Sequence, residues 1–287
     1  MEAAADVRAY TDNFALSPDE KQVAVSIAAG GGSRSDVWIV DLARNVTSRL
    51  THDERGSTAG RDVVWSPDGL ELAYSLYTKS AATTADIGVR KTNGVGKEDV
   101  IVDSSNPEYV EDWSADGKFL IYATWAPTPN DFWAVGLADR KPFPVLQSPY
   151  RKDEPHFSPD GKWIAYASEE SGKWEVYAVS FPKADQKRQI SNSGGSQPRW
   201  RRDGKELFYL AADGKLMVVD VTTSASNIQS GIPRVLFDTR LSMSPTMDQY
   251  AVTADGQRFL LLKTVGGEAS EPLTVVVNWP SIVKKFK

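Results

Sequence analysis

The sequence predicts an all-β protein in which one structural unit occurs six times around a ring. Three observations lead to this prediction: a short polar turn recurs six times, an apolar segment of constant register follows every turn, and a further strand follows each apolar segment. The turn is Ser-Pro-Asp-Gly or a variant of it, and successive turn aspartates lie 49, 48, 44, 43 and 52 residues apart. A period in the forties is typical of stacked supersecondary units. The six aspartates are Asp19, Asp68, Asp116, Asp160, Asp203 and Asp255.

The turn is built from residues that suit a type I β-turn. Ser66 occupies the first position, Pro67 the second with its preset backbone angle, and Gly69 the fourth. Residues 158–161 repeat the motif in full, whereas Glu20 stands where the first copy would have glycine. We interpret the turn aspartates as caps of their own backbone amides. Carboxylates also bind calcium, but these belong to six separate units and are expected to lie far apart.

The segment after each turn is predicted to be a strand that is buried on both faces. The residues four and six positions beyond the aspartate are hydrophobic, and so is the residue between them. A strand with one face in water would instead alternate between apolar and polar residues. An aromatic residue often precedes the turn, and Trp65, Trp113 and Trp200 are expected in the core between units. The two columns are Val23, Leu72, Leu120, Ile164, Leu207 and Phe259, and Val25, Tyr74, Tyr122, Tyr166, Tyr209 and Leu261.

Two more strands complete each unit. A third strand is predicted in every unit, and a weaker fourth follows, for example at 49–51, 100–102 and 188–191. Four strands per unit, with neighbours on both faces, describe a six-bladed β-propeller of four-stranded antiparallel blades. The predicted third strands are 37–42, 87–92, 132–137, 174–179, 216–221 and 273–279.

The chain is predicted to form a single domain over residues 1–287. Blade six has few residues left after its third strand, so the segment from Val7 to Tyr10 is expected to supply its outer strand and close the ring. Closure would remove the exposed sheet edges of the first and last blades. The predicted blades cover residues 14–51, 62–102, 109–147, 154–191, 198–237 and 248–279, the last together with 6–10.

The composition argues against several classes of partner. The net charge is −5, and no basic run is longer than Lys284-Lys285, so nucleic acid is not expected. The chain has no cysteine, which excludes disulfides and thiolate chemistry and leaves the compartment open. No stretch approaches about eighteen apolar residues, and residues 1–6 lack the features of a signal peptide. We expect a monomer without membrane contact, and residues 1–5 are compatible with an expression start before an excised domain.

Residues 158–166, with the strand at 174–179, resemble the repeat of the TolB-type (WD40-like) propeller family. That family includes periplasmic TolB, the propellers of prolyl-oligopeptidase-type peptidases, and the C-terminal sensor propellers of bacterial receptor-like serine/threonine kinases. The closing segment 259–279 is similar to the ends of the kinase-linked propellers. The resemblance covers residues 6–279 and implies a bacterial, periplasmic or extracytoplasmic module. One propeller scaffold supports many tasks, so the function has to be argued from a site.

No catalytic constellation is recognisable, and the chain is not expected to be an enzyme. A serine hydrolase would need a Gly-x-Ser-x-Gly elbow, which does not occur, and Ser57 stands one place early in the nearest match. His52 and His156 are too few for an ordinary zinc site, and neither a metal nor a cofactor is expected. The alternative is a lyase or glycan hydrolase at the channel mouth. Glu111 and Asp112 are adjacent on a strand, however, and are expected to point to opposite faces.

The best candidate site is the rim of the central channel, formed by the segments that lead into each turn. Acidic, basic, amide and imidazole groups from different blades would converge there and could bind a small polar ligand, a peptide or a protein partner. The alternative is that a solvated rim is simply polar. Glu154, His156 and Arg199 come from adjacent blades and are the expected centre of a site. The candidates are Asp62, Glu111, Asp112, Glu154, His156, Gln197, Arg199 and Tyr250, with Asn13, Asp153 and Asp248 beside them.

A second candidate is the long connection in blade three. Pro127 and Pro129 stiffen it, and Trp125 and Trp133 flank it, a composition suited to a partner hot spot or to sugar stacking. The alternative is that both tryptophans are wedged between blades.

Two classes of function remain open from the sequence. The first is a non-enzymatic binding module, either a ligand- or protein-sensing domain of a larger bacterial protein such as a receptor-like kinase, or a stand-alone TolB-like periplasmic scaffold. The second is an enzyme at the channel mouth, or the propeller of a prolyl-oligopeptidase-type peptidase without its catalytic domain.

Overall fold

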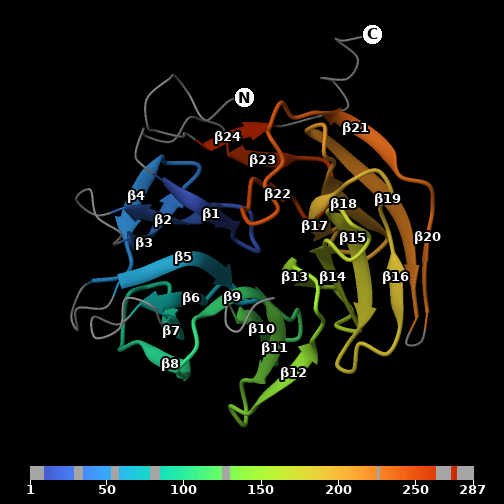
Figure 1. Ribbon diagram of the computed structural model, residues 1–287. Coiled ribbons are helices and arrows are strands. Elements are labelled where there is room, and N and C mark those ends of the chain that lie inside the picture. Colours follow the sequence, from blue (N-terminus) through green and yellow to red (C-terminus); the bar gives the residue numbers. More distant parts are fainter. Residues whose placement is uncertain are drawn as a thin grey trace.

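The structure is a computed structural model that describes residues 10–28, 35–52, 58–77, 85–124, 130–224, 227–262 and 273–276. Every regular element in these ranges is a β-strand, and the sheets stand around a central axis (Figure 1). The fold is therefore the all-β propeller that the repeat predicts. Within the same ranges, no helix has the length and apolar character needed to cross a bilayer.

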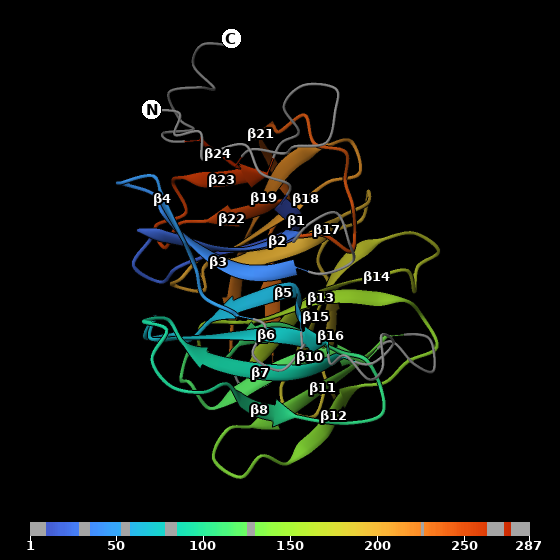
Figure 2. The same cartoon turned by 90° about the vertical axis from the view of Figure 1, so that its left-hand side faces the viewer.

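The first sheet has eight antiparallel strands and carries the first two repeats. Its strands follow the order β1, β2, β3, β5, β6, β7 and β8, and β4 pairs with β3. Figure 2 shows this sheet from the side, where β3, β5, β6 and β7 lie one below another. The strands are β1 (Tyr10–Leu16), β2 (Gln22–Ala28), β3 (Ser35–Asp41), β4 (Val46–Arg49), β5 (Thr58–Trp65), β6 (Glu71–Tyr77), β7 (Ala85–Lys91) and β8 (Asp99–Val102).

Each of the other sheets carries one repeat. The third and fourth repeats form four-stranded antiparallel sheets, and the fifth forms a sheet of five strands because the long strand β19 pairs with β21 near its start and with β20 at its end. The described part of the last repeat has three strands. These strands are β9 (Glu108–Trp113), β10 (Phe119–Thr124), β11 (Asp131–Gly136), β12 (Pro142–Leu146), β13 (Lys152–Phe157), β14 (Trp163–Ser168), β15 (Glu175–Ser180), β16 (Lys187–Gln189), β17 (Ser196–Trp200), β18 (Glu206–Leu210), β19 (Lys215–Thr223), β20 (Ile228–Ser230), β21 (Arg234–Asp238), β22 (Tyr250–Val252), β23 (Phe259–Leu262) and β24 (Leu273–Val276).

The number of blades predicted from the sequence is wrong. The described strands form five sheets rather than six, and only two of the five have four strands. The physical reason is a pairing between repeats: Ser35 at the start of β3 lies opposite Ala59 in β5, which joins the first two repeats into one sheet. A count of sequence repeats cannot reveal such a pairing, because it depends on how two neighbouring units approach each other.

The recurring turn is held by one hydrogen-bonding pattern. The Ser66 hydroxyl donates to the Asp68 carboxylate (Oγ to Oδ1, 2.6 Å) and accepts from the amide of Glu71 (2.9 Å). Gly69 donates its amide to the Ser66 carbonyl with a φ of +73°, a left-handed conformation that favours glycine. The same serine-to-aspartate bond occurs at Ser17, Ser114 and Ser158, and Thr253 makes it in the last repeat.

The hydrophobic core lies between successive repeats. One cluster joins Ala73 and Ile87 of the second repeat to Val110 and Leu120 of the third, and equivalent clusters join the other neighbours. Both faces of the second strand of a repeat are buried, as its sequence predicts; in β14 all six residues are buried. Each sheet therefore depends on its neighbours to cover its apolar faces.

The first and last repeats contact each other directly. The Glu20 carboxylate accepts hydrogen bonds from the Ala254 amide (2.8 Å) and from the Arg258 guanidinium, and the Asp248 amide donates to Asn13 Oδ1 (2.9 Å). The predicted closing strand at 7–10 lies outside the described residues except for Tyr10, which belongs to β1 and lies opposite Ile27 in the first sheet.

Candidate functional site

Six inner strands surround the centre of the ring: β1, β5, β9, β13, β17 and β22 (Figure 1). They are the strands that lead into each turn, and the predicted candidates lie on or next to five of them. The geometry of these strands therefore decides which side chains reach the centre.

The inner strands are irregular where the candidate residues lie. The pairing register shifts between Asp153 and His156 in β13 and between Ser196 and Arg199 in β17. Glu154 and Gln197 lie inside these shifts with φ values of +54° and +56°, unusual for residues other than glycine. A β-bulge of this kind lets a side chain leave the ladder and point elsewhere, and bulges are common beside binding sites.

Similar irregularities occur in β5 and β9. The register of β5 shifts between Ala59 and Val63, next to Asp62. In β9, Asp112 lies opposite Ile121 while Val110 lies opposite Tyr122, so Glu111 is the additional residue. The regular alternation that the sequence argument assumed for Glu111 and Asp112 does not hold at this point.

Side chains from different repeats form a hydrogen-bonded belt around part of the centre. Asn13 donates to Asp62, whose other oxygen accepts from the Ser75 hydroxyl (3.1 Å), and Ser75 in turn accepts from the Val110 amide (3.2 Å). The belt thus links the first, second and third repeats. It continues backwards through the bond from the Asp248 amide to Asn13.

The belt also links the fifth and last repeats. Gln197, which is fully buried, donates to Gln249 Oε1 and to the Ser244 carbonyl (both 2.7 Å), and accepts from the Gln249 amide (2.8 Å). The Tyr250 hydroxyl donates to the backbone carbonyl of Gln197 (2.7 Å). Gln197 and Tyr250 therefore have structural roles at this junction.

Glu154 stands where this belt is interrupted. The residue is 4% exposed, and neither carboxylate oxygen has a partner at hydrogen-bonding distance and angle among the described residues, although the backbone amide of Gln197 lies near enough to lower the pKa of the acid. A buried carboxylate without a partner is costly, so such a group usually marks either strain or a place where a ligand binds.

Acidic residues predominate around Glu154. Burial, followed by the charges of neighbouring carboxylates, raises the pKa of Glu111 well above its usual value, and burial raises the pKa of Asp153 to about 7. Burial raises the pKa of Glu154 too, although the Arg199 charge opposes the shift. The central acidic cluster comprises Asp62, Glu111, Asp153, Glu154 and Asp248, whose charges act on one another.

Two basic side chains lie at the edge of this cluster. The Arg199 guanidinium forms an ion pair with Asp248, donates to the Pro198 carbonyl (2.9 Å), and stacks over the Tyr250 ring at 5.8 Å from its centroid. His156 Nδ1 lies 3.7 Å from Asp112 Oδ2, and its buried Nε2 has no partner among the described residues. Asp112 also accepts from the Phe157 amide (2.7 Å).

The structure brings most of the predicted rim residues together but divides their roles. Arg199 acts on Glu154 through its charge, whereas the ion-pair partner of Arg199 is Asp248 and that of His156 is Asp112. Among the described residues, no three histidine or carboxylate side chains are grouped closely enough to hold a metal ion.

The second predicted site is only partly described. Trp125, Pro127 and Pro129 lie outside the described residues. Trp133 is half-buried in β11 and packs against the core between the second and third repeats, which agrees with the alternative interpretation of this residue.

The sequence analysis missed two belt residues. Gln249 stands six positions before its turn aspartate, as Asn13, Asp62, Glu154 and Gln197 do in their own repeats, so the repeat register would have found it. Ser75 gave no comparable signal. The corresponding residues of the third and fourth repeats are alanine, and only the contact with Asp62 distinguishes the serine.

A ring of antiparallel sheets with polar side chains converging on its axis defines a β-propeller with a central site. The chain belongs to the TolB propeller family, since the family described as the TolB beta propeller domain matches residues 62–278. This match confirms the resemblance seen in the repeated turn.

Individual relatives agree with this assignment. An uncharacterized protein of Agrobacterium fabrum is 23% identical over 203 residues, covering 69% of this chain and 68% of that protein. The Tol-Pal system protein TolB of Francisella tularensis subsp. mediasiatica is 25% identical over 128 residues, covering 42% of this chain and 29% of that protein. The matched region thus spans less than a third of that relative.

Solved structures show the same fold. Putative TolB from Agrobacterium tumefaciens aligns with a TM-score of 0.62 at 20% identity, over 78% of this chain and 81% of that chain. TolB from Acinetobacter baumannii aligns with a TM-score of 0.66 at 17% identity, over 90% of this chain and 64% of that chain. An oligogalacturonate lyase in complex with manganese aligns with a TM-score of 0.58 at 16% identity, over 96% of this chain and 90% of that chain. Identities this low establish the fold, and the fold alone is shared by binding proteins and enzymes.

Proposed function

We propose that this chain is a non-enzymatic binding module that recognises a positively charged group of a ligand or protein partner at the ring centre. The observation that carries the proposal is Glu154, which is buried, acidic and without a hydrogen-bond partner among the described residues. An ammonium or guanidinium group would supply the donors that its oxygens lack.

The surrounding charges support a cationic ligand. Five carboxylates act on one another around the centre, and two cations oppose them: the charge of Arg199 lowers the pKa of Glu154, and the charge of Arg151 lowers the pKa of Asp153. Carboxylates that are partly removed from water are stabilised strongly by an added positive charge, because the local dielectric constant is lower than in bulk water. The same cluster would disfavour an anionic ligand.

The proposal extends to the biological setting. A sensing domain in a larger bacterial protein, such as a receptor-like kinase, and a periplasmic TolB-like scaffold would both use such a site. The family membership and the TolB relatives support an extracytoplasmic, protein-binding role for this chain. A parent gene that encodes an upstream kinase domain and one membrane-spanning helix would favour the sensor, and a gene with a signal peptide directly before the propeller would favour the scaffold.

The binding proposal is tested with two probes that differ in charge. The arginine ester is N-acetylarginine methyl ester, in which the guanidinium is the only charged group, and the citrulline ester is N-acetylcitrulline methyl ester, which carries a neutral urea group of nearly the same shape. Titration calorimetry should show binding of the arginine ester at least fivefold tighter than of the citrulline ester. The variant Glu154→Gln should weaken the binding of the arginine ester at least tenfold, because glutamine cannot carry the negative charge that pairs with the guanidinium.

The matched control is Asp220→Asn, which removes an exposed carboxylate on β19. It should leave the affinity for both probes unchanged. Equal binding of the two esters, or unchanged binding by Glu154→Gln, would contradict the proposal. Mass spectrometry can detect chemical conversion of either probe. Conversion by the wild type that the variant Glu154→Gln abolishes would support the enzyme alternative instead.

A further inference from the structure

The first four repeats carry an acidic residue at the same position. It lies near the start of the third strand, opposite the residue eight positions beyond the turn aspartate. Because the position is the same, the partners of the four carboxylates can be compared from repeat to repeat. The acids are Asp36 in β3, Asp86 in β7, Asp131 in β11 and Glu175 in β15.

Three of these acids pair with a basic side chain, and Asp86 is the exception. Among the described residues Asp86 forms no ion pair; burial and then the charge of Asp103 raise its pKa, whereas a hydrogen bond from the Ser104 amide lowers it. A buried carboxylate normally has a compensating cation, so the second repeat lacks a partner that its equivalents have. The three pairs are Asp36 with Arg49 (2.8 Å), Asp131 with Lys152 (2.9 Å) and Glu175 with Lys173 (3.1 Å).

The junction between the second and third repeats carries Glu108 where the next junction carries Lys152. These are the first residues of β9 and β13, and both stand eight positions before the turn aspartate of their repeat. Both also lie opposite the residue eight positions beyond that aspartate. Lys152 binds Asp131 of the preceding repeat, whereas the charge that acts on Glu108 from the preceding repeat is that of Asp86. A cation has thus been replaced by a third acid.

Asp103 replaces a hydroxyl donor at the same junction. Thr51 donates to Asp36 (3.2 Å), and Ser191 donates to Glu175. In all three repeats this residue follows the one that bonds to the neighbour of the acid on the third strand. The second repeat therefore has a carboxylate where two others have a hydroxyl that serves the acid.

We call Asp86, Asp103 and Glu108 the acidic junction. Glu108 is 3% exposed; its Oε1 accepts from the Ser104 hydroxyl, and its Oε2 has no hydrogen-bond partner among the described residues. Burial raises the pKa of Glu108 to about 7; the Ser104 bond opposes this shift, and the charges of Asp86 and Asp103 add to it. The Glu108 charge in turn raises the pKa of Tyr122 in β10, after burial. A buried oxygen without a partner, beside two more carboxylates, indicates a missing donor.

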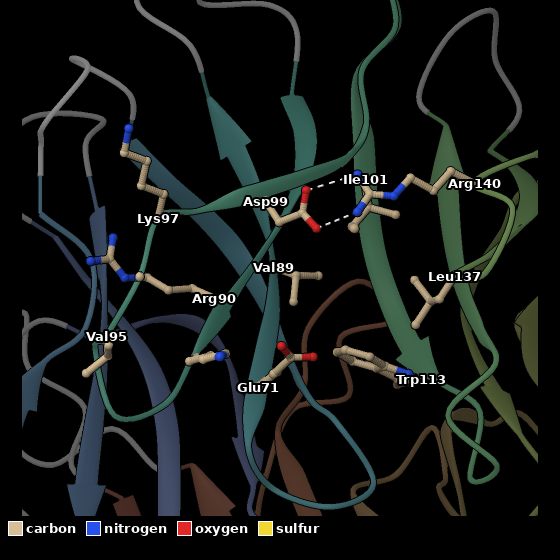
Figure 3. A pocket seen from close by; sticks show the side chains of 12 residues that line it. Glu71, Val89, Arg90, Val95, Lys97, Asp99, Ile101, Trp113, Leu137 and Arg140 are labelled. Atoms are coloured by element: carbon tan, nitrogen blue, oxygen red, sulfur yellow. Dashed lines mark hydrogen bonds and ion pairs between the residues drawn. The ribbon is translucent and has the colours of Figure 1, made fainter.

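The same two repeats also lack a bond near the turns. Trp65 donates its indole N–H to the Ala15 carbonyl of the preceding repeat (3.0 Å), whereas the indole N–H of Trp113 has no acceptor among the described residues. A cavity of about 410 Å³ opens beside Trp113, and the ion pair between Asp99 and Arg140 crosses the junction there (2.6 and 3.0 Å; Figure 3). A ligand that supplies a cation at the acidic junction would add a link between these repeats.

We propose that the acidic junction binds a primary alkylammonium group, supplied by a small amine or by a lysine side chain of a partner. The group would take the place that the Lys152 ammonium has at the next junction, where it donates to Asp131 and to the Ser148 carbonyl (3.4 Å). In the preceding repeat the equivalents of these two acceptors are Asp86 and the Ser104 carbonyl.

The remaining carboxylates strengthen this recognition. Glu108 and Asp103 add negative charge, and charge-assisted hydrogen bonds are stronger than neutral ones. Asp103 and Ser104 are exposed, so an ammonium can approach from the surface on their side. The proposal does not rest on the ring centre, because the carboxylates that act on Glu108 are Asp86 and Asp103.

The probe is N-acetyl-lysine methylamide, and its neutral counterpart is N-acetyl-6-hydroxynorleucine methylamide, in which a hydroxyl replaces the ammonium. In two-dimensional amide NMR spectra of the whole chain, the signals of Asp103, Ser104 and Glu108 should move with a dissociation constant on the order of 1 mM, given about 0.3 kcal/mol for each non-hydrogen atom. The hydroxyl analogue should bind at least fivefold more weakly. The affinity for the lysine probe should rise between about pH 6 and about pH 8, because Glu108 then loses its proton.

A second amine separates the two sources of the ammonium. The n-butylammonium ion has the lysine side chain without the peptide groups. Equal affinity for both amines supports the site and favours a small amine, and tighter binding of the lysine probe supports the site and favours a lysine residue of a partner.

Variants locate the bound probe. Asp103→Asn, at an exposed position, and Glu108→Gln should each weaken the lysine probe at least threefold. Glu108→Lys gives this junction the residue of the next one, so it should abolish binding and raise the midpoint of thermal unfolding. The matched control is Asp220→Asn, which removes an exposed carboxylate on β19 and should leave the affinity unchanged.

Several results would overturn the proposal. These are unmoved amide signals at residues 103–108, equal binding of the hydroxyl analogue, unchanged affinity in both Asp103→Asn and Glu108→Gln, or undiminished binding by Glu108→Lys. Saturation of the same signals by calcium chloride, with no response to either amine, would replace the proposal by a metal site. Signal changes confined to residues around Glu154 would report the ring centre and would contradict binding at the acidic junction.

Discussion

At the residue scale, the backbone conformation of Glu154 helps to explain why this residue is a candidate for ligand binding. It adopts a positive φ directly before Pro155, inside a bulge of β13. Gln197 does the same before Pro198 in β17, but its amide bonds to Gln249 and Ser244. The two residues share a backbone conformation, and only the carboxylate is left without a partner. The difference arises from the neighbouring repeat and not from the strand itself.

Burial of these acids predicts an unusual dependence of stability on pH. An acid whose pKa is higher in the folded chain than in the unfolded chain keeps its proton in the folded state at intermediate pH. The free energy of unfolding then falls as pH rises from the unfolded pKa to the folded one. For Asp153 that interval runs from 3.8 to about 7, and the pKa of Glu154 is shifted in the same direction.

Replacement of Glu154 by glutamine should therefore stabilise the protein at neutral pH. We expect the variant to gain roughly 1–2 kcal/mol over the wild type at about pH 7.5 and nothing at about pH 4, because the wild type loses stability as pH rises above the unfolded pKa of Glu154 and glutamine does not titrate. Urea denaturation across this range measures it. Asp220→Asn serves as the exposed control, and an equal effect of Glu154→Gln at both pH values would contradict the prediction.

At the scale of elements, the serine of the turn does more than favour a bend. Its hydroxyl bonds at once to the turn aspartate and to the amide that begins the next strand, so turn and strand are fixed together. The fifth repeat reaches the same end differently, because Arg201 replaces the serine and grips Asp203 with two bonds of 2.7 Å. These bonds lower the pKa of Asp203 to about 2. The motif can therefore change in sequence while its function in the fold persists.

Removal of this hydroxyl is predicted to destabilise the chain. Ser158 is 1% exposed and bonds to Asp160 Oδ1 (2.6 Å) and to the Trp163 amide (3.0 Å), so Ser158→Ala should cost about 1–2 kcal/mol of unfolding free energy. Chemical denaturation gives the value. Ser171→Ala, in an exposed turn where the hydroxyl donates to the Lys173 carbonyl at 3.3 Å, should change stability by less than about 0.5 kcal/mol. A similar loss in both variants would show that the buried bonds are not responsible.

Much of the element pattern could be predicted from the sequence because it is local. The turn residues, the doubly buried second strands and the third strands all depend on side chains close together in the chain. The bulges were not predicted, although Pro155 and Pro198 inside inner strands are a usable signal for them. The pairing of Ser35 with Ala59 left no signal, because it joins residues of different repeats.

At the scale of the whole molecule, closure depends on a departure from the repeat. Glu20 occupies the glycine position of the first turn with a φ of +61°, which is unfavourable for a residue with a side chain. Its carboxylate bonds to Ala254 and Arg258, at the other end of the chain. The first turn therefore lacks the glycine that its backbone conformation favours. The glutamate in its place supplies the carboxylate that joins the first repeat to the last.

Restoring the glycine is predicted to weaken the protein. Glu20→Gly relieves a backbone conformation worth about 1 kcal/mol but removes both closing bonds, and we expect a net loss of about 1–2 kcal/mol. Thermal unfolding measures the loss, and amide exchange should rise in β22 and β23. The control is Asn45→Gly, at an exposed position with a φ of +51°, which should be neutral or stabilising. Stabilisation by Glu20→Gly would mean that these bonds do not hold the ring closed.

The sequence by itself determined the all-β class, the repeated turn and the need of every sheet for covered faces. These follow from residue types at short and regular spacings, which act on the chain before it folds back on itself. The tertiary structure decided the number of sheets, the interruption of the polar belt at Glu154 and the lack of an acceptor for the Trp113 indole N–H among the described residues. Each of these depends on which groups of distant repeats meet, and a repeated sequence gives similar residues to junctions that differ in their contacts.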